Sequence, residues 1–565
     1  MVDPRPWLAS YPPGVPARID GGGCESIVAM FDAACARYPE RPAYSNFGTT
    51  MTWAELDRLS ARFAGYLVAE WHLAKGDRLA IMLPNLLQYP IALFGALRAG
   101  LVVVNVNPLY TARELEHQLS DSGATAIVVL ENFAATLARA LPRTPVQHVI
   151  VTSLGDQLGF PKGALLSFAV KHIKKMVPAW TLPGHVCFGD ALRAGAQHQP
   201  PAAAVGRDDI AFLQYTGGTT GVAKGATLTH GNMVDNTLQL AAWVGDLFTR
   251  GEERMITALP LYHIFSLTVN ALFMMHLGGE NVLVTNPRDI PAFIKILKQA
   301  RWSAITGVNT LYNALLNDPG FAAVDCSHTK FALAGGMAVQ RAVAERWKRA
   351  TGIPLIEGYG LTEASPVVTA NPLTIKDYTG SIGLPLPSTD VALHDDAGHP
   401  VAPGEPGELC VRGPQVMRGY WQRPDETAKV LDADGWLRTG DIARIDERGY
   451  VFIVDRKKDM ILVSGFNVFP NEVEDVVARH PGVREVAAVG VPDEHSGEVV
   501  KLFVVRKDPA LTEAALKQYC HDELTGYKRP KYIEFRDELP KSNVGKILRR
   551  ALRDEAQRDN TGHTR

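Results

Sequence analysis

The sequence predicts an α/β protein with more than one domain, in which parallel-rich sheets are built from βαβ units. The first observation is length, because 565 residues exceed what a single hydrophobic core usually supports. The second is that apolar strands alternate with amphipathic helices as far as about residue 380, which is typical of sheets covered on both faces. The third is a change of texture after residue 380, where short β-rich runs are broken by Gly, Pro and Asp. We therefore expect a large N-terminal domain that includes a small β-barrel-like subdomain, and a small α+β C-terminal domain.

The first half of the chain gives the clearest elements. Residues 1–20 are rich in proline and predict an extended arm. Thr52 and Glu55 have the spacing of a capping box, which predicts the start of a helix over residues 52–72. Apolar spacing predicts further helices over 26–38, 88–99 and 113–122, strands over 77–83, 102–106, 126–129 and 210–213, and a hairpin over 43–51.

The end of the chain has a different organisation. Strands expected over 407–412 and 449–454 belong to the β-rich region, for which we expect a small antiparallel barrel or sheet. The charged run at 455–459 has the composition of a linker. Beyond it, expected helices over 471–479 and 512–523 and strands over 483–490 and 499–505 indicate an α+β domain. The predicted domains are residues 1–455, with the β-rich subdomain at 380–455, and residues 459–565.

Charge and cysteine content exclude several classes of protein. Lys plus Arg count 58 and Asp plus Glu count 60, so the formal net charge is −2 and no global field would attract nucleic acid. The six cysteines are scattered without metal-ligand spacing, which indicates reduced thiols. The N-terminus lacks the order of a secretory signal, and no apolar run reaches the roughly 18 residues that span a bilayer. We expect a cytoplasmic protein that can still rest on the inner face of the membrane.

A segment rich in glycine and threonine, residues 214–226, follows the strand expected at 210–213. Glycines allow a tight turn that brings backbone N–H groups close to an anion, and threonine hydroxyls and a lysine add donors for phosphate. The motif is not a P-loop, because Lys224 lies between Ala223 and Gly225. The alternative is a flexible turn without a ligand. The candidate residues are Tyr215, Thr216, Gly217, Gly218, Thr219, Thr220, Gly221 and Lys224.

A second polar segment, residues 357–363, follows an apolar strand expected at 354–356. Glu363 offers a carboxylate for Mg²⁺, which takes oxygen ligands and usually shares them with substrate phosphates. Thr362 can donate to a phosphate, and Tyr359 has a flat face on which a purine can stack. A structural role is the alternative for each residue alone.

Asp441 closes a third segment, residues 436–441. A carboxylate at a strand end can accept two hydrogen bonds from ribose hydroxyls, and Arg456 in the linker can contact the same nucleotide. The alternative for Asp441 is the cap of a turn.

Lys546 carries the fourth motif. It follows Gly545 in a short loop before a basic helix. A lysine at such a position is usually solvated, so its functional interest comes from the three motifs that precede it.

The four motifs, in this order and at this separation, resemble the adenylate-forming superfamily of acyl-CoA synthetases, luciferases and peptide-synthetase adenylation domains. The resemblance extends from about residue 25 to 555. Within the superfamily the chain is similar to the bacterial long-chain fatty-acid–CoA ligases. The segments that carry this similarity are YTGGTTGVAKGATLTHGNM, LPLYHIF, EGYGLTE, DRKKDMILVSGFNVFPNEVE and LPKSNVGK.

The resemblance implies a two-step reaction in which ATP, a fatty acid and CoA give acyl-CoA, AMP and pyrophosphate through an acyl-adenylate. It places ATP phosphates against the glycine-threonine segment and Lys224, with Thr362 at the α-phosphate and Mg²⁺ on Glu363 and Thr216. It places Lys546 where it reaches both the carboxylate and the phosphate. The remaining nucleotide contacts that it implies are Gly336, Glu357 and Tyr359 for adenine, and Asp441 and Arg456 for ribose.

The same resemblance implies that the C-terminal domain is a mobile lid. It would rotate about Lys458 in a hinge at residues 456–458, withdraw Lys546 and bring in a CoA-binding loop. The loop residues are Ser464, Gly465 and Phe466.

The acyl site is expected near the apolar run at 260–277, with His263, Phe265 and Phe273 as candidate lining residues. Some long-chain relatives have a tryptophan just after the matching histidine, where it gates the tunnel. Here Ile264 follows His263, so any gate must differ. The alternative for each residue is ordinary core.

Residues 163–180 combine apolar residues with three lysines, which is typical of a helix lying on anionic lipid, although a solvated helix is the alternative. A homodimer is usual for similar enzymes. The rival functions are a medium-chain or aryl-acid CoA ligase, an adenylation enzyme that delivers its acyl group to a carrier protein, and a fatty-acid-binding or uptake protein without catalysis. The last leaves the phosphate motifs without a purpose.

Overall fold

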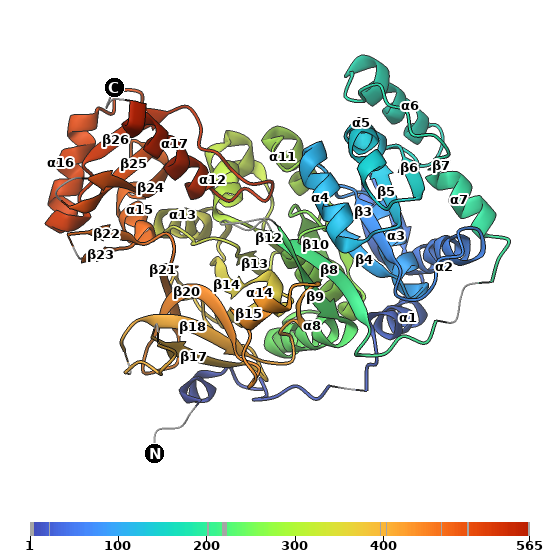
Figure 1. Cartoon of the computed structure of the whole chain (residues 1–565), viewed down its shortest axis with the longest axis horizontal. Coiled ribbons are helices and arrows are strands. Elements are labelled where there is room, and N and C mark those ends of the chain that lie inside the picture. Colours follow the sequence, from blue (N-terminus) through green and yellow to red (C-terminus); the bar gives the residue numbers. More distant parts are fainter. Residues whose placement is uncertain are drawn as a thin grey trace.

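The computed structural model describes residues 5–21, 23–199, 203–216, 223–395, 397–402, 404–464, 466–493 and 496–562. Two large sheets form the body of the molecule, and the C-terminal elements lie to one side of it (Figure 1). A four-stranded sheet comes between the large sheets and the C-terminal elements in the sequence. In space it lies beside the body and beside the C-terminal elements.

The first large sheet has eight strands in the order β19-β9-β8-β4-β3-β5-β6-β7. Strands β4, β3, β5, β6, β7 and β8 pair in parallel, whereas β9 pairs antiparallel with both β8 and β19. The strands are β3 (Arg78–Met82), β4 (Val102–Asn105), β5 (Ala126–Leu130), β6 (His148–Thr152), β7 (Val186–Cys187), β8 (Ile210–Thr216), β9 (Lys224–Thr229) and β19 (Gly419–Tyr420). Its helices are α2 (Trp53–Ala69), α3 (Gln88–Arg98), α4 (Ala112–Ser122), α5 (Glu131–Ala140), α6 (Lys162–Phe168) and α7 (Phe188–Gly195).

The second large sheet has nine strands in the order β16-β15-β14-β13-β12-β10-β11-β1-β2, with a parallel centre and antiparallel edges. The strands are β1 (Pro42–Asn46), β2 (Thr49–Thr52), β10 (Arg254–Thr257), β11 (Glu280–Leu283), β12 (Ala304–Gly307), β13 (Phe331–Ala334), β14 (Ile356–Gly360), β15 (Val367–Ala370) and β16 (Leu384–Pro385). The helices in this part are α1 (Ile27–Arg37), α8 (His230–Val244), α9 (Ile264–Ser266), α10 (Phe273–Leu277), α11 (Ile290–Gln299), α12 (Asn309–Asn317) and α13 (Arg341–Thr351).

The β-rich region is an antiparallel sheet in the order β17-β18-β20-β21, formed by β17 (Asp390–His394), β18 (Gly407–Arg412), β20 (Leu437–Ile445) and β21 (Val451–Arg456), with α14 (Pro424–Ala428) beside it in the chain. The C-terminal domain has a five-stranded sheet with three helices. Its elements are β22 (Ile461–Val463), β23 (Phe466–Val468), α15 (Pro470–Ala478), β24 (Val483–Asp493), β25 (Gly497–Arg506), α16 (Glu513–Glu523), β26 (Tyr532–Arg536) and α17 (Arg549–Gly562).

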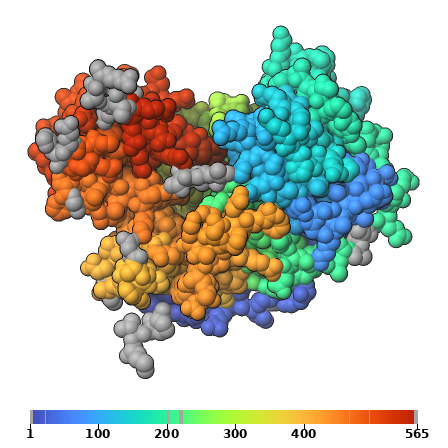
Figure 2. Space-filling view, viewed as in Figure 1, coloured from blue at the N-terminus to red at the C-terminus, as the bar shows by residue number. Residues whose placement is uncertain are grey.

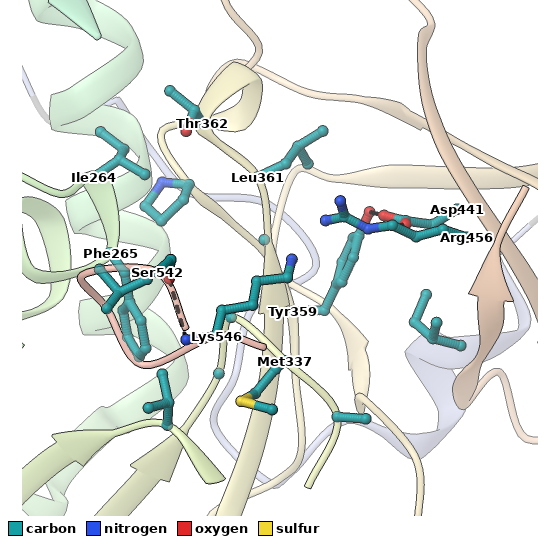
Figure 3. A pocket seen from close by; sticks show the side chains of 18 of the residues that line it. Ile264, Phe265, Met337, Tyr359, Leu361, Thr362, Asp441, Arg456, Ser542 and Lys546 are labelled. Carbon is teal, nitrogen blue, oxygen red and sulfur yellow. Dashed lines mark hydrogen bonds and ion pairs between the residues drawn. The ribbon is translucent and has the colours of Figure 1, made fainter. Parts of the chain in front are cut away.

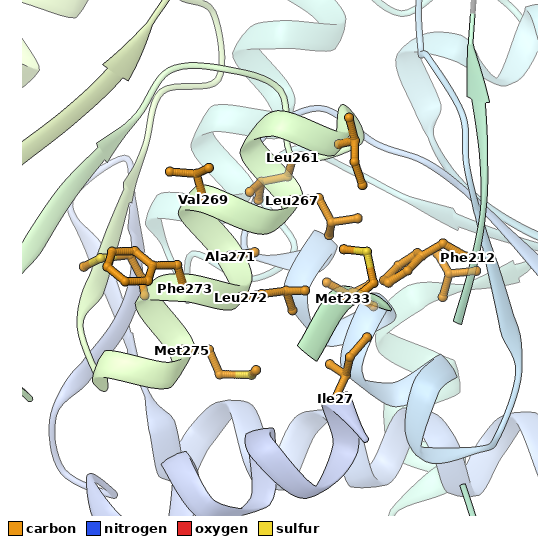
Figure 4. Packing of buried hydrophobic residues seen from close by; sticks show 14 of the residues in the cluster. Ile27, Phe212, Met233, Leu261, Leu267, Val269, Ala271, Leu272, Phe273 and Met275 are labelled. Atoms are coloured by element: carbon orange, nitrogen blue, oxygen red, sulfur yellow. The ribbon is translucent and has the colours of Figure 1, made fainter. Parts of the chain in front are cut away.

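The main hydrophobic core lies where α1, α8 and α10 meet the large sheets. Figure 4 shows Ile27 of α1, Met233 of α8 and Leu272 packing together near Phe212 of β8. All four side chains are at most 1% exposed. Leu272 ends η5 (Leu267–Leu272), a π-helical turn that leads into α10. This packing fixes the helices whose other faces line the candidate site.

Most expected elements are present, several with ends shifted by a few residues, and two differ most in extent. The capping box of Thr52 and Glu55 starts α2. The expected helix at 163–180 is shorter, because α6 continues only through the π-helical turn η3 (Ala169–Ile173) and the chain then adopts a left-handed conformation at Lys175. The strand expected at 354–356 runs on as β14 to Gly360, so residues 357–360 lie on a strand. Among the described helices, none is both long and apolar enough to cross a membrane.

Candidate active site

One cavity of about 2450 Å³ lies where the carboxyl ends of the parallel strands meet the C-terminal domain. Thr216 at the end of β8, Val308 after β12 and Gly336 after β13 line it, as expected for ligand sites in α/β sheets. Residues 541–550 line it from the C-terminal side. Figure 2 shows the C-terminal residues, in red, lying against the rest of the molecule. The volume exceeds that of an ordinary ligand pocket, so several substrates or one long substrate can fit.

Tyr359, Asp441 and Arg456 come together at one end of this cavity (Figure 3). The Tyr359 hydroxyl donates to Asp441 Oδ2 at 2.6 Å, and Arg456 Nε lies 3.4 Å from Asp441 Oδ1. Asp441 and Arg456 face each other across the paired strands β20 and β21. Burial raises the pKa of Tyr359 well above its usual range, so its hydroxyl stays a hydrogen-bond donor. The aromatic face and the carboxylate are therefore held in fixed positions.

Glu357 and Gly336 line the same end of the cavity. Gly336 has φ +77°, a conformation that side chains rarely adopt. Burial, together with the charge of Asp475, raises the pKa of Glu357 to about 8. Most of the Glu357 carboxyl is therefore protonated at pH 7 and can donate a hydrogen bond.

Thr216 and Lys224 lie opposite each other at the paired ends of β8 and β9. Lys224 Nζ donates to Glu426 Oε2 at 2.5 Å and lies 4.7 Å from the centre of the Tyr420 ring. The Tyr420 hydroxyl in turn donates to Glu363 Oε1 at 2.7 Å. Tyr420 therefore links the lysine of the first motif to the carboxylate of the second.

Lys546 extends into the middle of the cavity. Figure 3 shows its side chain between Thr362 on one side and the Asp441–Arg456 pair on the other. Its backbone N–H donates to Ser542 Oγ at 3.1 Å. Its ammonium faces the cavity, which protein surrounds. This burial, with a smaller contribution from the positive charge of Arg456, lowers the pKa of Lys546 to about 7.

Two contacts hold the Lys546 loop against the N-terminal domain. Thr310 Oγ1 donates to the Gly545 carbonyl at 2.8 Å, and Gly545 has φ +81°. The second contact is the pair of Arg549 with Asp455 at the end of β21, at 3.2 Å. Within the C-terminal domain itself, Arg549 also pairs with Glu474 of α15, at 2.7 Å. The Asp455 side chain is fully buried, so the Arg549 clamp, defined by Arg549, Asp455 and Glu474, fixes the lid in this position.

The apolar end of the cavity runs between α8, α10 and β13. His263, Phe265 and Phe273, the candidate acyl-site residues, line the cavity at this end. Burial, followed by the positive charge of Lys546, lowers the pKa of His263 to about 4, so its imidazole is neutral at pH 7. Its Nδ1 accepts a hydrogen bond from the Phe265 N–H at 3.3 Å. Other apolar lining residues are Leu240, Trp243, Val244, Val269, Phe331 and Leu333.

The structure brings most of the predicted site residues to this cavity. Lys458 also lines it, and burial lowers its pKa. Ser464 and Phe466, predicted to bind CoA, do not line the cavity, and Phe466 stacks on Tyr527 with ring centres 4.9 Å apart. The predicted residues that lie outside the described part of the chain are Gly217, Gly218, Thr219, Thr220, Gly221 and Gly465.

Sequence reasoning missed several residues that shape the site. Tyr420 and Glu426 have no local signal, because they lie far along the chain from Glu363 and Lys224. Thr310, which contacts the Lys546 loop, has none either. The apolar residues of α8 have the spacing of one face of an amphipathic helix, but that spacing does not show that they line a cavity.

The fold and this arrangement define an enzyme class. Residues 31–421 match the AMP-binding enzyme family and residues 472–546 match the AMP-binding enzyme C-terminal domain. The chain belongs to the AMP-binding enzymes, the adenylate-forming class.

Particular relatives narrow the comparison. The chain is 59% identical over 551 residues, 98% of each chain, to the long-chain-fatty-acid–CoA ligase of Escherichia coli O157:H7. It is 39% identical over 559 residues to the long-chain-fatty-acid–CoA ligase of Bacillus subtilis (strain 168), covering 98% of this chain and 99% of that one. The crystal structure of the anthranilate CoA ligase AuaEII in complex with anthranoyl-AMP is 25% identical, with a TM-score of 0.85 over 96% of this chain and 100% of that one.

Proposed function

We propose that this protein is a long-chain fatty-acid–CoA ligase, which converts ATP, a fatty acid and CoA into acyl-CoA, AMP and pyrophosphate through an acyl-adenylate. The observation that carries the proposal is one continuous cavity that joins the polar end at Tyr359 and Asp441 to the apolar end at Phe273. The polar end suits a nucleotide, and the apolar end suits an acyl chain. The 59% identity to a relative named for this activity supports the same substrates.

In the first step a carboxylate oxygen attacks the α-phosphorus of ATP, the bond to the bridging oxygen breaks, and pyrophosphate leaves with the electron pair. Displacements of this kind need positioning and charge neutralisation more than a protein nucleophile. Thr362 would donate to the α-phosphate, Lys224 would balance the departing phosphates, and Lys546 would reduce the repulsion between the two anions. The Lys224–Glu426 ion pair must open for this role.

The nucleotide would be held by groups that the fold already positions. Tyr359 would stack on the adenine, with Gly336 and Glu357 beside it. Asp441 and Arg456 would hold the ribose. This set supports the assignment because Tyr359 and Arg456 both already contact Asp441.

Magnesium is part of the proposal, and Glu363 and Thr216 would hold it. The fit is favourable because both residues are half-buried and both line the cavity. Tyr420 donates to Glu363 Oε1 at 2.7 Å, and within the described ranges Glu363 Oε2 accepts no hydrogen bond. No cluster of three His, Cys, Asp or Glu side chains occurs in the described ranges, and Mg²⁺ characteristically needs only one or two carboxylates plus phosphates and water. Bound Mg²⁺ would neutralise phosphate charge.

In the second step the CoA sulfur attacks the acyl carbon, the bond to the AMP oxygen breaks, and the thiol proton is released. We propose that residues 459–565 rotate for this step about a hinge at 456–458, withdrawing Lys546 and bringing in the loop at Ser464 and Phe466. The position of that loop away from the cavity supports a second arrangement, because Ser464 and Phe466 do not line the cavity here and so cannot guide CoA to the acyl group in it.

The direct test is ATP–pyrophosphate exchange and AMP release with acetate, octanoate, hexadecanoate, benzoate and anthranilate. Exchange should be fastest with hexadecanoate, and AMP release should require CoA. Absence of exchange with every acid would overturn the adenylation step. Faster turnover of an aryl or medium-chain acid would retain the chemistry and reject the long-chain substrate.

Two further expectations belong to this proposal. A peripheral contact with an anionic membrane would bring the enzyme to a substrate that partitions into lipid. A homodimer stays a prediction, which sedimentation equilibrium of the full chain would check.

A further inference from the structure

Exposed apolar side chains gather in one short stretch of the protein. Twelve large hydrophobic residues are exposed in the described part of the chain, and five of them fall within residues 160–176. The exposed fractions reach 92% at Phe160 and 71% at Ile173. The other three are Leu165, Phe168 and Met176. Scattered exposed hydrophobics are ordinary, whereas a contiguous group marks an interaction surface.

A second segment, distant in sequence, extends this group. Phe47, 43% exposed, lies in the turn between β1 and β2. Thr49 Oγ1 donates to the Leu158 carbonyl at 3.3 Å, and Lys162 Nζ donates to Thr49 Oγ1 at 3.3 Å. The hairpin turn therefore lies beside the start of α6. We call these six apolar residues and Lys162, Lys171, Lys174 and Lys175 the α6 surface.

The α6 surface is the outer face of an anchored segment. The opposite face holds it in place, with Val170 buried and Gly163 so close to Gly155 that a Cβ on Gly155 would lie 2.1 Å from the Gly163 carbonyl oxygen. Asn132 Nδ2 also donates to the Met176 carbonyl at 3.0 Å. The apolar side chains therefore project from a fixed base.

The charge of the surface has one sign. Residues 157–189 contain no Asp or Glu, although the whole chain has 60 of them against 58 Lys and Arg. Lys171 lies 3.9 Å from Glu131. Lys174 and Lys175 have no ion-pair partner among the residues that the structure describes. Exposed apolar groups bordered by unpaired ammonium groups match an anionic lipid headgroup layer above hydrocarbon.

We propose that the α6 surface docks on an anionic lipid bilayer, with Phe160 and Ile173 entering the headgroup boundary and the lysines contacting the phosphates. A second copy of the chain is a poorer occupant. A twofold contact would place the same patch on both partners, so the lysines of one would face those of the other. The α6 surface lacks negative charge, and an anionic lipid bilayer supplies it.

The position of the surface suits an enzyme with a moving lid. Figure 1 shows α6 at the opposite end of the molecule from the C-terminal domain, and the same region projects from the body in Figure 2. Docking there leaves the cavity and residues 459–565 clear of the bilayer. The docking proposal rests on the membrane contact given under the proposed function and names the surface that makes it. Its test is separate from that of the ligase reaction, because binding is measured without ATP.

The test is co-sedimentation of the full chain with vesicles of phosphatidylcholine alone or with one quarter phosphatidylglycerol. One variant carries Lys171→Gln, Lys174→Gln and Lys175→Gln, and a second carries Phe160→Ser and Ile173→Ser. The matched charge control carries Lys295→Gln, Lys298→Gln and Lys507→Gln, which are exposed lysines elsewhere. The apolar control carries Leu247→Ser and Tyr532→Ser.

The wild type should bind the anionic vesicles and lose binding in high salt. The lysine variant should bind them roughly 100-fold more weakly, since each lysine near an anionic surface contributes about a fivefold factor. The apolar variant should lose at least about tenfold, and both controls should match the wild type. Exchange activity with dissolved octanoate should be equal in all five proteins, which shows that the variants are folded.

Three results would overturn the docking proposal. One is a wild type that ignores anionic vesicles. Another is equal vesicle binding by the α6 variants and their controls. The third is a change from dimer to monomer in the apolar variant with vesicle binding intact, which would assign the surface to a second copy.

Discussion

The Lys546 side chain should make adenylate formation depend on pH near neutrality. Its pKa of about 7 means that about nine-tenths of the ammonium is charged at pH 6 and about one-tenth at pH 8. If only the charged form neutralises the reacting anions, kcat/KM for ATP–pyrophosphate exchange should fall about tenfold between these pH values. The value of kcat should fall less, because bound phosphates favour the charged form.

The matched comparison is Lys546→Arg, which stays charged throughout this range. Measuring both enzymes in the same buffers cancels the ionisation of ATP itself. The arginine variant should be slower but should lack the tenfold decline. Lys546→Ala should lose exchange yet still convert supplied acyl-adenylate and CoA to thioester. The reasoning is refuted if wild type and Lys546→Arg show the same pH profile, or if the alanine variant loses both half-reactions equally.

Three other perturbations test separate parts of the site. Lys458→Pro should spare pyrophosphate exchange but slow thioester formation at least tenfold, because a fixed φ at the hinge restricts rotation; normal overall turnover would argue against a hinge there. Trp243→Leu should enlarge the apolar end and shift kcat/KM toward longer acids by up to about fourfold for each added methylene, at about 0.8 kcal/mol per buried CH₂; an unchanged preference across acids of 12 to 20 carbons would place the acyl chain elsewhere. Glu357→Gln should flatten the pH dependence of Tm. The folded protein holds the Glu357 proton up to about pH 8, so wild-type stability is present at low pH and falls by up to about 1.4 kcal/mol per pH unit as pH rises toward 8. A variant whose Tm tracks the wild type from pH 5 to 8 would contradict this.

Local signals carried much of the fold. The capping box at Thr52 and Glu55 determines where α2 begins through contacts three residues apart, so the sequence contains all of it. Likewise Gly407–Arg412 is a strand with the predicted bounds, because Pro406 precedes it and Gly413 and Pro414 follow it. The helix expected over residues 163–180 was too long because apolar spacing continued after the backbone had turned at Lys175.

The site was predicted in pieces and assembled only in three dimensions. Asp441 and Arg456, predicted to contact the same nucleotide, lie opposite each other because they are register partners on the adjacent strands β20 and β21. The link from Tyr420 to Glu363 spans 57 residues, and that from Thr310 to Gly545 spans 235, so neither has a local pattern. Such contacts depend on how the sheets and domains meet. The unusual pKa of Lys546 follows from the same assembly, since burial is its main cause.

The Arg549 clamp couples the rate of the first chemical step to the rate at which the C-terminal domain rotates. Arg549 lies only three residues after Lys546, at the first position of α17, so the catalytic charge and the grip on Asp455 move as one piece. Breaking a buried ion pair by removing one partner typically costs about 3–5 kcal/mol. A substitution that weakens the Arg549–Asp455 pair would therefore shorten the time for which Lys546 stays in the cavity. It would speed the rotation of the C-terminal domain and slow the first chemical step. The strength of the Arg549–Asp455 pair would therefore balance the two half-reactions against each other, and the overall rate would depend on whichever of them is slower for a given substrate.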